Sequence, residues 1–395
     1  MDYFKESLKL HKQLKGKIEI KSKVQLKTKE DLSLAYTPGV AEPCREIAKH
    51  PETVYDYTQK ANTIAIVTDG SAVLGLGNIG AEASLPVMEG KSVLFKEFGN
   101  INCIPICIKT QDTQEIIQIV KNIAPAFGGI NLEDISGPRC FEIEDALQDI
   151  GIPVFHDDQH GTAIVILAAL INAAKVVGKR LEDLKITIFG AGAAGIATAK
   201  LLLCINHDRN LCTAVKEIIL IDSVGPIHWE RKNLTGIKQY IAEHTNRSNL
   251  KTIEQAVKGA DVLIGVSQPG AITEAMIKQM AAKPIVLALA NPTPEIMPDV
   301  AKKAGAYIMG TGRSDFPNQI NNVLAFPGIF KGALDAGATQ ITPGMKIAAA
   351  YALADCIERP SQEKIVPYAL EKGVADKVAA AVQAQAEKEG VTRFS

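Results

Sequence analysis

The sequence has no marked excess of charge of either sign. Its 395 residues carry a formal net charge of −1 at pH 7, so electrostatics gives no reason to expect binding to nucleic acid or to an anionic membrane surface. Apolar residues make up 47% and charged residues 22% of the chain, as in ordinary soluble globular proteins. A chain of this length forms two or three domains, each with a core of its own.

The sequence also has no apolar run long enough to cross a membrane. The longest run, residues 163–174, contains Asn172 and is far shorter than the roughly 20 residues that a membrane span requires, so it predicts a buried helix. The first thirty residues contain nine lysines and no arginine, which is not typical of a transit peptide. Apolar residues of one parity between Ile18 and Leu26 predict a half-buried strand there. We therefore expect a cytoplasmic protein with neither a membrane nor a nucleic-acid partner.

The seven cysteines do not have the spacing of a metal site. Cys103 and Cys107 occur in the apolar segment CIPIC, and no other soft ligands lie near them in the sequence, which argues against zinc. The remaining cysteines are scattered along the chain. An odd number of scattered cysteines is typical of a protein from a reducing compartment, so we expect reduced thiols.

Short β-branched runs alternate with helical patterns along the chain, which predicts an α/β fold. Most of the runs are continuously apolar, as in parallel strands that are covered on both faces. The expected strands are 63–68, 92–95, 103–108, 129–132, 153–155, 185–189, 217–221, 261–265 and 285–290. Helical patterns cover 345–357 and 374–388, and the sequence does not show which domain they pack against.

A helix after Gly161 carries the chain from one predicted sheet to the next. We therefore place a domain boundary near this residue. Residues 1–160 are expected to form an N-terminal α/β domain for substrate and metal. Residues 161–395 are expected to form a Rossmann-type, doubly wound NAD(P)-binding domain with C-terminal helices.

The glycine pattern GxGxxG occurs twice, at residues 75–80 and 190–195. The second copy follows a predicted strand, opens a helix and leads to a strand that ends in Asp222, as in a dinucleotide-binding unit. The first copy follows TDGSAV rather than a strand, so we interpret its glycines as a packed turn. The pyrophosphate is expected at a helix N-terminus, on the backbone of Gly190, Gly192, Ala193, Ala194 and Gly195.

Asp222 lies where dinucleotide-binding folds contact the ribose of the nucleotide. A carboxylate at this position accepts hydrogen bonds from a 2′-hydroxyl and repels a 2′-phosphate, which slightly favours NAD over NADP. Arg231 and Lys232 are close enough in the sequence to contact a phosphate. Both nucleotides therefore stay open.

Two pairs of acids each end an apolar run: Glu133 and Asp134 follow GGINL, and Asp157 and Asp158 follow IPVFH. The ends of parallel strands gather ligand groups, and four converging carboxylates without a cation would be forced to stay partly protonated. A set of three oxygen ligands suits Mg²⁺ or Mn²⁺. One pair alone would more simply be a helix cap or a solvated turn, but two pairs at two strand ends favour a metal site.

Lys91 and Tyr36 are candidate proton-transfer groups. Lys91 stands at the start of the predicted strand 92–95, where a nearby cation would lower its pKa towards that of a general base. Tyr36 precedes a Pro-Gly turn, and a phenol that is protonated at neutral pH can act as an acid. The simpler alternatives are a surface lysine and a core tyrosine. His156 and His160 are interpreted as structural.

Seven motifs follow one another between Tyr36 and about Leu353. They are AYTPGVAEPCREI, TDGSAVLGLGNIG, FGGINLEDISGPRC, PVFHDDQHGTA, FGAGAAG, LALANPTPEI and GRSDFPNQINNVLAFPGIFKGALD. In this order they resemble the malic enzymes of the short bacterial type. The resemblance implies oxidative decarboxylation of L-malate to pyruvate and CO₂ with NAD⁺ or NADP⁺, and a homodimer.

The resemblance also implies roles for individual residues. Glu133, Asp134 and Asp158 would hold the Mg²⁺ or Mn²⁺ ion, with Asp157 as a catalytic residue beside them. Lys91 would be the base and Tyr36 the acid that protonates C3. Contacts to substrate or nicotinamide would come from Lys91, Asn291, Asn321 and Asn322.

One position departs from the longer members of the family. They carry an arginine just before LGLG that binds a malate carboxylate, whereas this chain has Ala72 there. The group that replaces this arginine is therefore open, with Lys91 and Asn321 or Asn322 as candidates.

Three other functions are compatible with parts of this pattern. In malolactic conversion the same site would retain its nucleotide and release lactate. A nucleotide-sensing regulator would bind without reacting, which the paired acids and Lys91 argue against. An amino-acid dehydrogenase shares the two-domain layout but needs no divalent metal.

Overall fold

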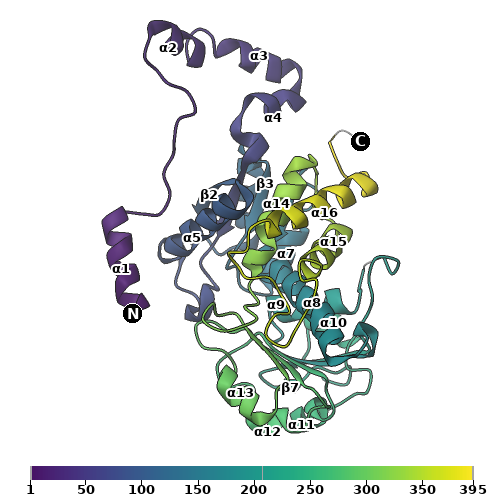
Figure 1. Cartoon of the computed structure of the whole chain (residues 1–395). Coiled ribbons are helices and arrows are strands. Elements are labelled where there is room, and N and C mark those ends of the chain that lie inside the picture. The colour runs from purple at the N-terminus through teal and green to yellow at the C-terminus, as the bar shows by residue number, and fades with distance from the viewer. Residues whose placement is uncertain (1, 207, 394–395) are drawn as a thin grey trace.

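The computed structural model describes residues 2–206 and 208–393, which form two sheets with helices packed around them (Figure 1). This arrangement confirms the predicted α/β fold. The first sheet has four strands in the order β2-β1-β3-β4, and all of its neighbouring strands are parallel. Its strands are β1 (Thr63–Thr68), β2 (Asn102–Cys107), β3 (Gly129–Leu132) and β4 (Val154–His156).

The second sheet has six strands in the order β10-β9-β8-β5-β6-β7. Only the short pairing of β7 with β6 is antiparallel. Because the chain passes from β5 to β6 on one side and later to β8 on the other, the strand order reverses at β5, where doubly wound sheets bind their ligands. The strands are β5 (Lys185–Phe189), β6 (Glu217–Asp222), β7 (Gly225–Pro226), β8 (Val262–Gly265), β9 (Ile285–Ala288) and β10 (Ile308–Thr311).

Helix α8 (Asp157–Val177) connects the two sheets. It begins directly after β4, four residues earlier than the expected start at Gly161. By length and composition α8 could cross a membrane, but 72% of its most apolar window is buried inside the protein. It is therefore a core helix, as the sequence predicted.

The C-terminal helices α14 (Phe326–Asp335), α15 (Pro343–Ala354) and α16 (Val374–Glu389) complete the core between the sheets. Gly328 and Gly332 allow α16 to approach α14 closely, because a Cβ at Gly332 would lie 2.3 Å from the Ala379 carbonyl oxygen. Helix α14 also packs on α5 (Ala81–Gly99) of the N-terminal half. The C-terminal helices thus pack against both halves of the chain. The sequence had left open which domain they contact.

The remaining helices cover the faces and ends of the two sheets (Figure 1). Most of them are short. They are α6 (Thr113–Ile123), α7 (Arg139–Asp145), α9 (Ala193–Leu202), α10 (Gly236–Ala242), α11 (Ile253–Val257), α12 (Glu274–Ile277) and α13 (Pro298–Ala304). Helix α9 is the one that matters for the site, because it follows the glycine-rich turn after β5.

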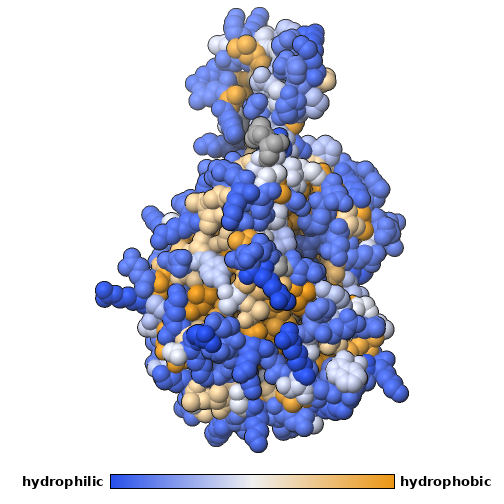
Figure 2. All heavy atoms as spheres, turned by 90° about the vertical axis from the view of Figure 1, so that its right-hand side faces the viewer, coloured by the Kyte–Doolittle hydropathy of each residue, from blue (hydrophilic) through white to orange (hydrophobic). Residues whose placement is uncertain are grey.

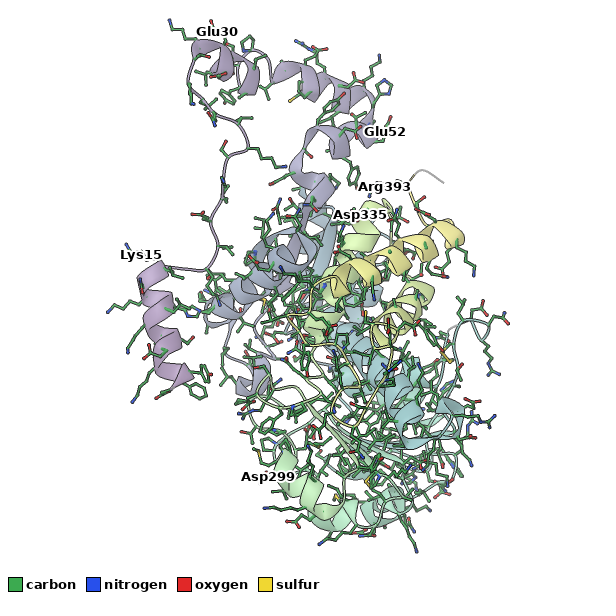
Figure 3. The ribbon with its side chains drawn as sticks, in the orientation of Figure 1. Lys15, Glu30, Glu52, Asp299, Asp335 and Arg393 are labelled. Carbon is green, nitrogen blue, oxygen red and sulfur yellow. A yellow bond between two sulfur atoms is a disulfide. The ribbon has the colours of Figure 1, made fainter. Side chains whose placement is uncertain are left out.

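Residues 18–57 form an arm that projects from the body of the protein (Figure 1). The arm carries α2 (Lys29–Ala35), α3 (Ala41–Lys49) and α4 (Val54–Tyr57), none of which has a buried residue. Glu30 and Glu52 mark its outer part in Figure 3, and Arg393 lies near its base. The side chain of Arg393 stacks 3.6 Å from the ring of Tyr55. Helix α1 (Tyr3–Leu14) precedes the arm and lies beside α5 in Figure 1.

Three predictions made from the sequence are wrong. The strand expected between Ile18 and Leu26 is an irregular segment in which Ile20 is 93% exposed. The strand expected at 92–95 is part of α5, whose buried residues Ser84, Met88 and Phe95 follow helical spacing. The thiols are not all reduced, since Cys204 and Cys212 form a disulfide. Strands β7 and β10 were not predicted.

A cluster of four buried aromatic rings carries much of the contact between the halves of the chain. The ring of Phe95 in α5 lies 4.5 Å from that of Phe326 and 5.5 Å from that of Phe330, both in α14. Phe155 in β4 lies 5.9 Å from Phe330. The cluster ties the C-terminal tail to the strand that leads into α8.

We expect Phe330→Ala to lower the free energy of unfolding by about 3–5 kcal/mol, because it opens a cavity among these rings. Thermal and denaturant unfolding curves measure the change. Leu370→Ala is the matched control, since Leu370 is 82% exposed and its removal should shift the midpoint very little. Equal midpoints for the two variants would contradict the role of the aromatic cluster.

Candidate active site

A cavity of about 930 Å³ lies between the two halves of the chain. Its walls come from α5, from the segments that follow β3 and β4, and from the glycine-rich turn before α9. The loops after β8 and β9 and residues 320–322 close the opposite side. The cavity therefore lies where both sheets present the carboxyl ends of their strands, the usual place for ligands in parallel α/β folds.

Three carboxylates meet at one end of this cavity. One oxygen each of Glu133, Asp134 and Asp158 lies within 4.8 Å of the other two. Glu133 and Asp134 follow β3, and Asp158 lies in the first turn of α8, directly after β4. Because β3 and β4 are neighbouring parallel strands, their ends meet at the same edge. The backbone N–H of Asp134 donates a hydrogen bond of 2.8 Å to Asp158 Oδ2, which holds the two segments together.

The negative charge of the three carboxylates is not balanced by the positive groups around them. Burial is the largest cause that raises their pKa values, and the neighbouring carboxylates add to it. The pKa of Glu133 rises to about 7, that of Asp134 to about 9 and that of Asp158 to about 6. Asp134 Oδ2 is buried and has no hydrogen-bond partner among the described residues. An all-oxygen set with an unsatisfied buried oxygen fits a hard divalent cation such as Mg²⁺ or Mn²⁺.

Lys91 points from the middle of α5 into the acidic end of the cavity. Its ammonium donates to Glu133 Oε1 at 2.8 Å and to Asp157 Oδ2, and it lies 4.2 Å from the centre of the Phe326 ring. Burial alone would lower the pKa of Lys91, but Asp157 and Glu133 outweigh it and raise this pKa above the usual range. With the acids alone, the pKa of Lys91 therefore does not fall. The fall predicted from the sequence requires a cation beside Lys91.

Asp157 joins the two halves of the site. It is fully buried, and its Oδ2 accepts hydrogen bonds from Lys91 and from the side-chain amide of Asn322. Gly161 lies one helical turn later, where a Cβ would come within 1.8 Å of Asp157 Oδ1. A glycine is therefore required at this position for the observed orientation of Asp157.

A buried glutamate that sequence reasoning missed fixes the start of α8. Glu144 in α7 accepts hydrogen bonds from the backbone N–H of His156, from Gln159 Nε2 and from His160 Nε2, at 2.9–3.1 Å. Burial would raise the pKa of Glu144, but His160 and the charge of Lys346 lower it to about 2. No motif in the sequence marks Glu144. Glu144 thus holds the ring of His160, whereas both ring nitrogens of His156 are buried without a hydrogen-bond partner among the described residues.

Glu295 plays a similar part on the nucleotide side and was also missed. It is fully buried and accepts hydrogen bonds from the N–H groups of Ser267 at 2.7 Å and Ala290 at 3.0 Å. It thereby ties together the loops that follow β8 and β9, both of which line the cavity. A Cβ at Gly265 would lie 2.4 Å from its carboxyl carbon, so the strand must end in glycine there.

The glycine-rich turn after β5 has the close contacts that a dinucleotide requires. A Cβ at Gly190 would lie 2.4 Å from the Val266 carbonyl oxygen, and one at Gly195 would lie 1.8 Å from the Gly190 carbonyl oxygen. Gly192 directly precedes α9, and Ala193 and Ala194 in its first turn line the cavity. Free N–H groups at such a helix start attract a pyrophosphate.

The first glycine pattern is a packed turn at the cavity wall, as interpreted from the sequence. A Cβ at Gly75 would lie 2.5 Å from the Asn291 carbonyl oxygen. The turn thus packs against the loop after β9. Ala72, Asn291, Asn321 and Asn322 all line the cavity.

Asp222 at the end of β6 is already saturated with hydrogen bonds. Arg231 donates to both of its oxygens at 2.9 and 3.1 Å, and Lys238 donates at 2.9 Å. Although partial burial favours the neutral form, these contacts hold the pKa of Asp222 well below its usual range. Lys232, the other cation considered from the sequence, is exposed and makes no ion pair with this acid. Because Arg231 and Lys238 balance its charge, Asp222 no longer gives a reason to favour NAD over NADP.

Tyr36 does not reach the cavity of its own chain. It ends α2 in the projecting arm, its side chain is 66% exposed, and it is not among the residues that line the cavity. Figure 1 shows α2 far from the helices and strands that surround the site. Among the candidate catalytic residues, the structure thus brings Lys91 and Asp157 together and leaves Tyr36 apart.

Comparison with known proteins gives two family matches that cover most of the chain. Residues 15–148 match the family model described as the malic enzyme N-terminal domain, and residues 159–387 match the malic enzyme NAD-binding domain. A malic enzyme crystal structure from Pyrococcus horikoshii is 48% identical, with a TM-score of 0.91, and covers 98% of this chain and 92% of its own.

Three curated bacterial relatives are similar over nearly the whole chain. The bifunctional malic/malolactic enzyme of Bacillus subtilis is 51% identical, over 100% of this chain and 96% of its own length. The NAD-dependent malic enzyme of Geobacillus stearothermophilus is 53% identical, over 96% and 78%. The NADP-dependent malic enzyme of Halomonas elongata is 46% identical, over 97% and 93%.

Proposed function

Since the chain belongs to the malic enzyme family, we propose that its cavity binds L-malate beside a divalent cation held by Glu133, Asp134 and Asp158. The protein is an NAD(P)-dependent oxidoreductase that converts L-malate to pyruvate and CO₂. The helix apolar enough to cross a membrane, α8, is mostly buried inside the protein, which supports a protein that does not span a membrane. A cytoplasmic location and the absence of a nucleic-acid partner stay predictions.

One observation carries the cation assignment: three carboxylate oxygens within 4.8 Å of one another, beside a buried oxygen that has no partner in the described part of the chain. A divalent cation bound there would supply Lewis-acid polarisation of the substrate oxygens and stabilise the negative charge that develops as CO₂ leaves. The three carboxylates would hold the cation in the cavity in which Lys91 lies.

Lys91 is the base in this proposal, because its Nζ lies in the cavity next to the three carboxylates. A nicotinamide bound in the dinucleotide site would supply the acceptor for the hydride from C2, and Lys91 would take the proton of the C2 hydroxyl. The amine must first be neutral, whereas the negative charges of Asp157 and Glu133 raise its pKa. A bound divalent cation would compensate the negative charge of those acids and would lower the pKa of Lys91 again. Asp157 holds the ammonium in place through its shared contact with Asn322.

The decisive assay mixes the protein with L-malate, Mn²⁺ and either nucleotide, and measures nicotinamide reduction and pyruvate. We expect a chelator to abolish turnover and Lys91→Ala to lower kcat by about 10²–10⁴, the usual contribution of a general base. Lys96→Ala is the matched control, since Lys96 is an exposed lysine of the same helix, and it should keep the parental rate. Full turnover in the presence of the chelator would refute the cation proposal.

Malolactic conversion is the second candidate, because the Bacillus subtilis relative is named for both activities. In that reaction the nucleotide stays bound, and the product is lactate rather than pyruvate. Product analysis in the same assay separates the two reactions. Lactate without net nicotinamide reduction would assign the malolactic route.

We propose that Arg231 and Lys238 bind the 2′-phosphate of NADP, so that the chain accepts both nucleotides. The two cations flank Asp222 at the ribose end of the dinucleotide site, and an arginine near this position is how such folds accommodate the phosphate. Arg231 also donates to the carbonyl oxygens of Gly225 and Pro226, so Lys238, whose side chain is 38% exposed, is the freer of the two.

Lys238→Gln should therefore lower kcat/KM for NADP by about tenfold, the loss expected for one charged hydrogen bond, and leave kcat/KM for NAD within about twofold. The ratio of the two constants is the measurement. Lys232→Gln, which changes an exposed neighbour outside this ion pair, should leave the ratio unchanged. A ratio that responds to Lys232 rather than Lys238 would reverse the assignment.

We propose that Tyr36 acts as the acid in the site of a second copy of this chain. Within one chain Tyr36 lies away from the cavity, and the arm that carries it exposes large apolar side chains. Ile20 is 93% exposed and Leu34 77%, and Figure 2 shows the arm as a separate lobe on which hydrophobic atoms reach the surface. Exposed apolar surface of this kind marks an interaction site, which supports the homodimer expected from the sequence.

This arrangement predicts that two inactive variants complement each other. In a mixture of Lys91→Ala and Tyr36→Phe chains, each mixed dimer holds one site with both residues intact. Random reassembly should then restore about a quarter of the parental activity. Each variant reassembled alone is the control. If Tyr36 served the site of its own chain, every site in the mixture would lack one residue and no activity would return.

A further inference from the structure

Helix α1 and the turn after it close one side of the active-site cavity. Ser7, His11 and Lys17 line the same cavity as Lys91 and the three carboxylates. Two hydrogen bonds anchor Lys17 to α5: its N–H donates to Glu89 Oε2 at 3.0 Å, and its Nζ donates to the Pro86 carbonyl oxygen at 2.6 Å. The N-terminal segment thus places an ammonium group at the cavity from outside both sheets.

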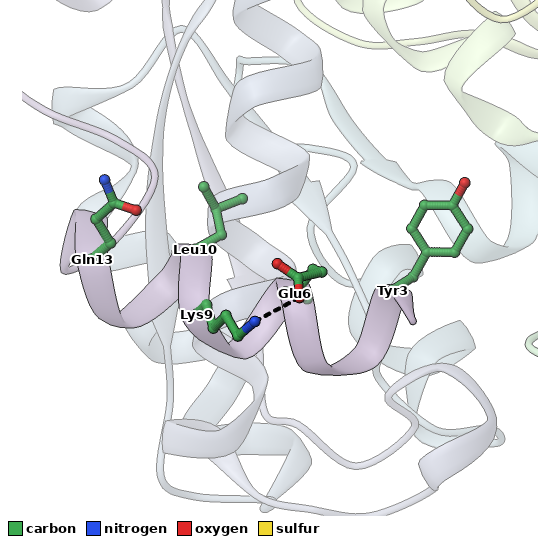
Figure 4. Close-up of a pocket in the computed structure, with 6 residues that line it drawn as sticks. Tyr3, Glu6, Lys9, Leu10 and Gln13 are labelled. Carbon is green, nitrogen blue, oxygen red and sulfur yellow. Dashed lines mark hydrogen bonds and ion pairs between the residues drawn. The ribbon is translucent and has the colours of Figure 1, made fainter. Parts of the chain in front are cut away.

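A second hollow beside α1 does not contribute to the active-site cavity. Figure 4 shows its lining, which consists of side chains of α1 alone, among them the ion pair of Glu6 and Lys9 at 2.7 Å. No group from the rest of the described chain lines it. Only the face of α1 that turns towards α5 is therefore relevant to a ligand.

The local sequence explains why Lys17 turns into the cavity. Helix α1 ends at Lys15 in a left-handed conformation, and Gly16 follows with a φ of +114°. Such a φ favours glycine. Gly90 of α5 leaves room for the side chain, because a Cβ there would lie 3.2 Å from Lys17 Nζ.

Lys17 is the cation of the cavity whose ammonium forms no direct ion pair with a carboxylate among the described residues. Among the described residues that line the cavity, Lys17 and Lys91 are the lysines, and there is no arginine. Lys91 is neutralised by Glu133 and Asp157. Lys17 Nζ instead donates to a backbone carbonyl. The charge of Glu89 also acts on Lys17, but no ion pair among the described residues uses the remaining N–H donors of its ammonium, which are available to an anion.

We propose that Lys17 binds the carboxylate of L-malate that the product pyruvate keeps. This inference rests on the proposed function, which supplies a dicarboxylate to the cavity that Lys17 shares with the three carboxylates. The position where longer malic enzymes carry an arginine is Ala72 here and offers no charge. Lys17 is thus the group that replaces it, rather than the candidates considered from the sequence.

The chemistry decides between the two carboxylates of the substrate. The carboxylate that leaves as CO₂ loses its negative charge in the transition state. A cation bound to it would stabilise the ground state more than the transition state and slow the reaction. The other carboxylate keeps its charge throughout, so a cation there binds substrate, transition state and product equally.

Uniform binding of this kind predicts an effect on affinity without an effect on the chemical step. In Lys17→Gln we expect the Kd values of L-malate and of pyruvate, measured by calorimetric titration with Mn²⁺ present, to rise together by about 10- to 100-fold, the loss expected for a charged hydrogen bond. The kcat at saturating malate should stay within about threefold. Lys17→Arg should recover most of the affinity.

Lys12→Gln is the matched control, because Lys12 is an exposed lysine of α1 that does not line the cavity; it should bind both ligands like the parent. Unchanged affinities in Lys17→Gln would overturn the proposal. Weaker binding of malate alone would overturn it too, because it would place Lys17 on the carboxylate that leaves. A parent protein that forms no pyruvate would refute the proposed function instead, whatever Lys17 does.

Discussion

The buried contact between Lys91 and the carboxylates of Glu133 and Asp157 is the interaction around which the site is built. Burying an ion pair costs solvation energy that its own attraction only partly returns, so such a pair is weak evidence for stability. Here one ammonium faces four buried or half-buried acids. The surplus of negative charge raises the pKa values of these acids. The arrangement is therefore best understood as one prepared for a further cation.

The backbone around the cavity is held by buried glutamates that take no direct part in the proposed chemistry. Glu144 fixes the first turn of α8, which carries Asp157 and Asp158. Glu295 joins the loops after β8 and β9. A Cβ at Gly161 would collide with Asp157, and one at Gly265 would collide with Glu295, so glycine is required at both positions. Positioning by buried hydrogen bonds keeps the reacting groups on a rigid frame, as an active site requires.

Two of the residues to which we assign a role in the reaction come from parts of the chain that lie outside the two sheets. Lys17 comes from the segment after α1 and depends on α5 for its anchor. Tyr36 lies in an arm that has no buried helix residue of its own. An N-terminal segment with so little packing of its own gains a defined position only against another surface. The packed core therefore holds the acids and Lys91 in place, whereas the N-terminal residues Lys17 and Tyr36 depend on contacts with other surfaces.

The sequence by itself determined the α/β fold, eight of the strands and the glycine-rich turn, because apolar runs and glycine patterns report local conformation. It also placed Glu133, Asp134 and Asp158 at the ends of two strands, and the pairing of β3 with β4 made those ends neighbours. Tertiary structure alone decided the rest. Residues 92–95 are helical because α5 buries Met88 and Phe95 on one face. Asp222 is paired with Arg231 and Lys238, and Lys17 and Lys91 line the same cavity. These contacts join residues far apart in the chain, and no local pattern encodes them.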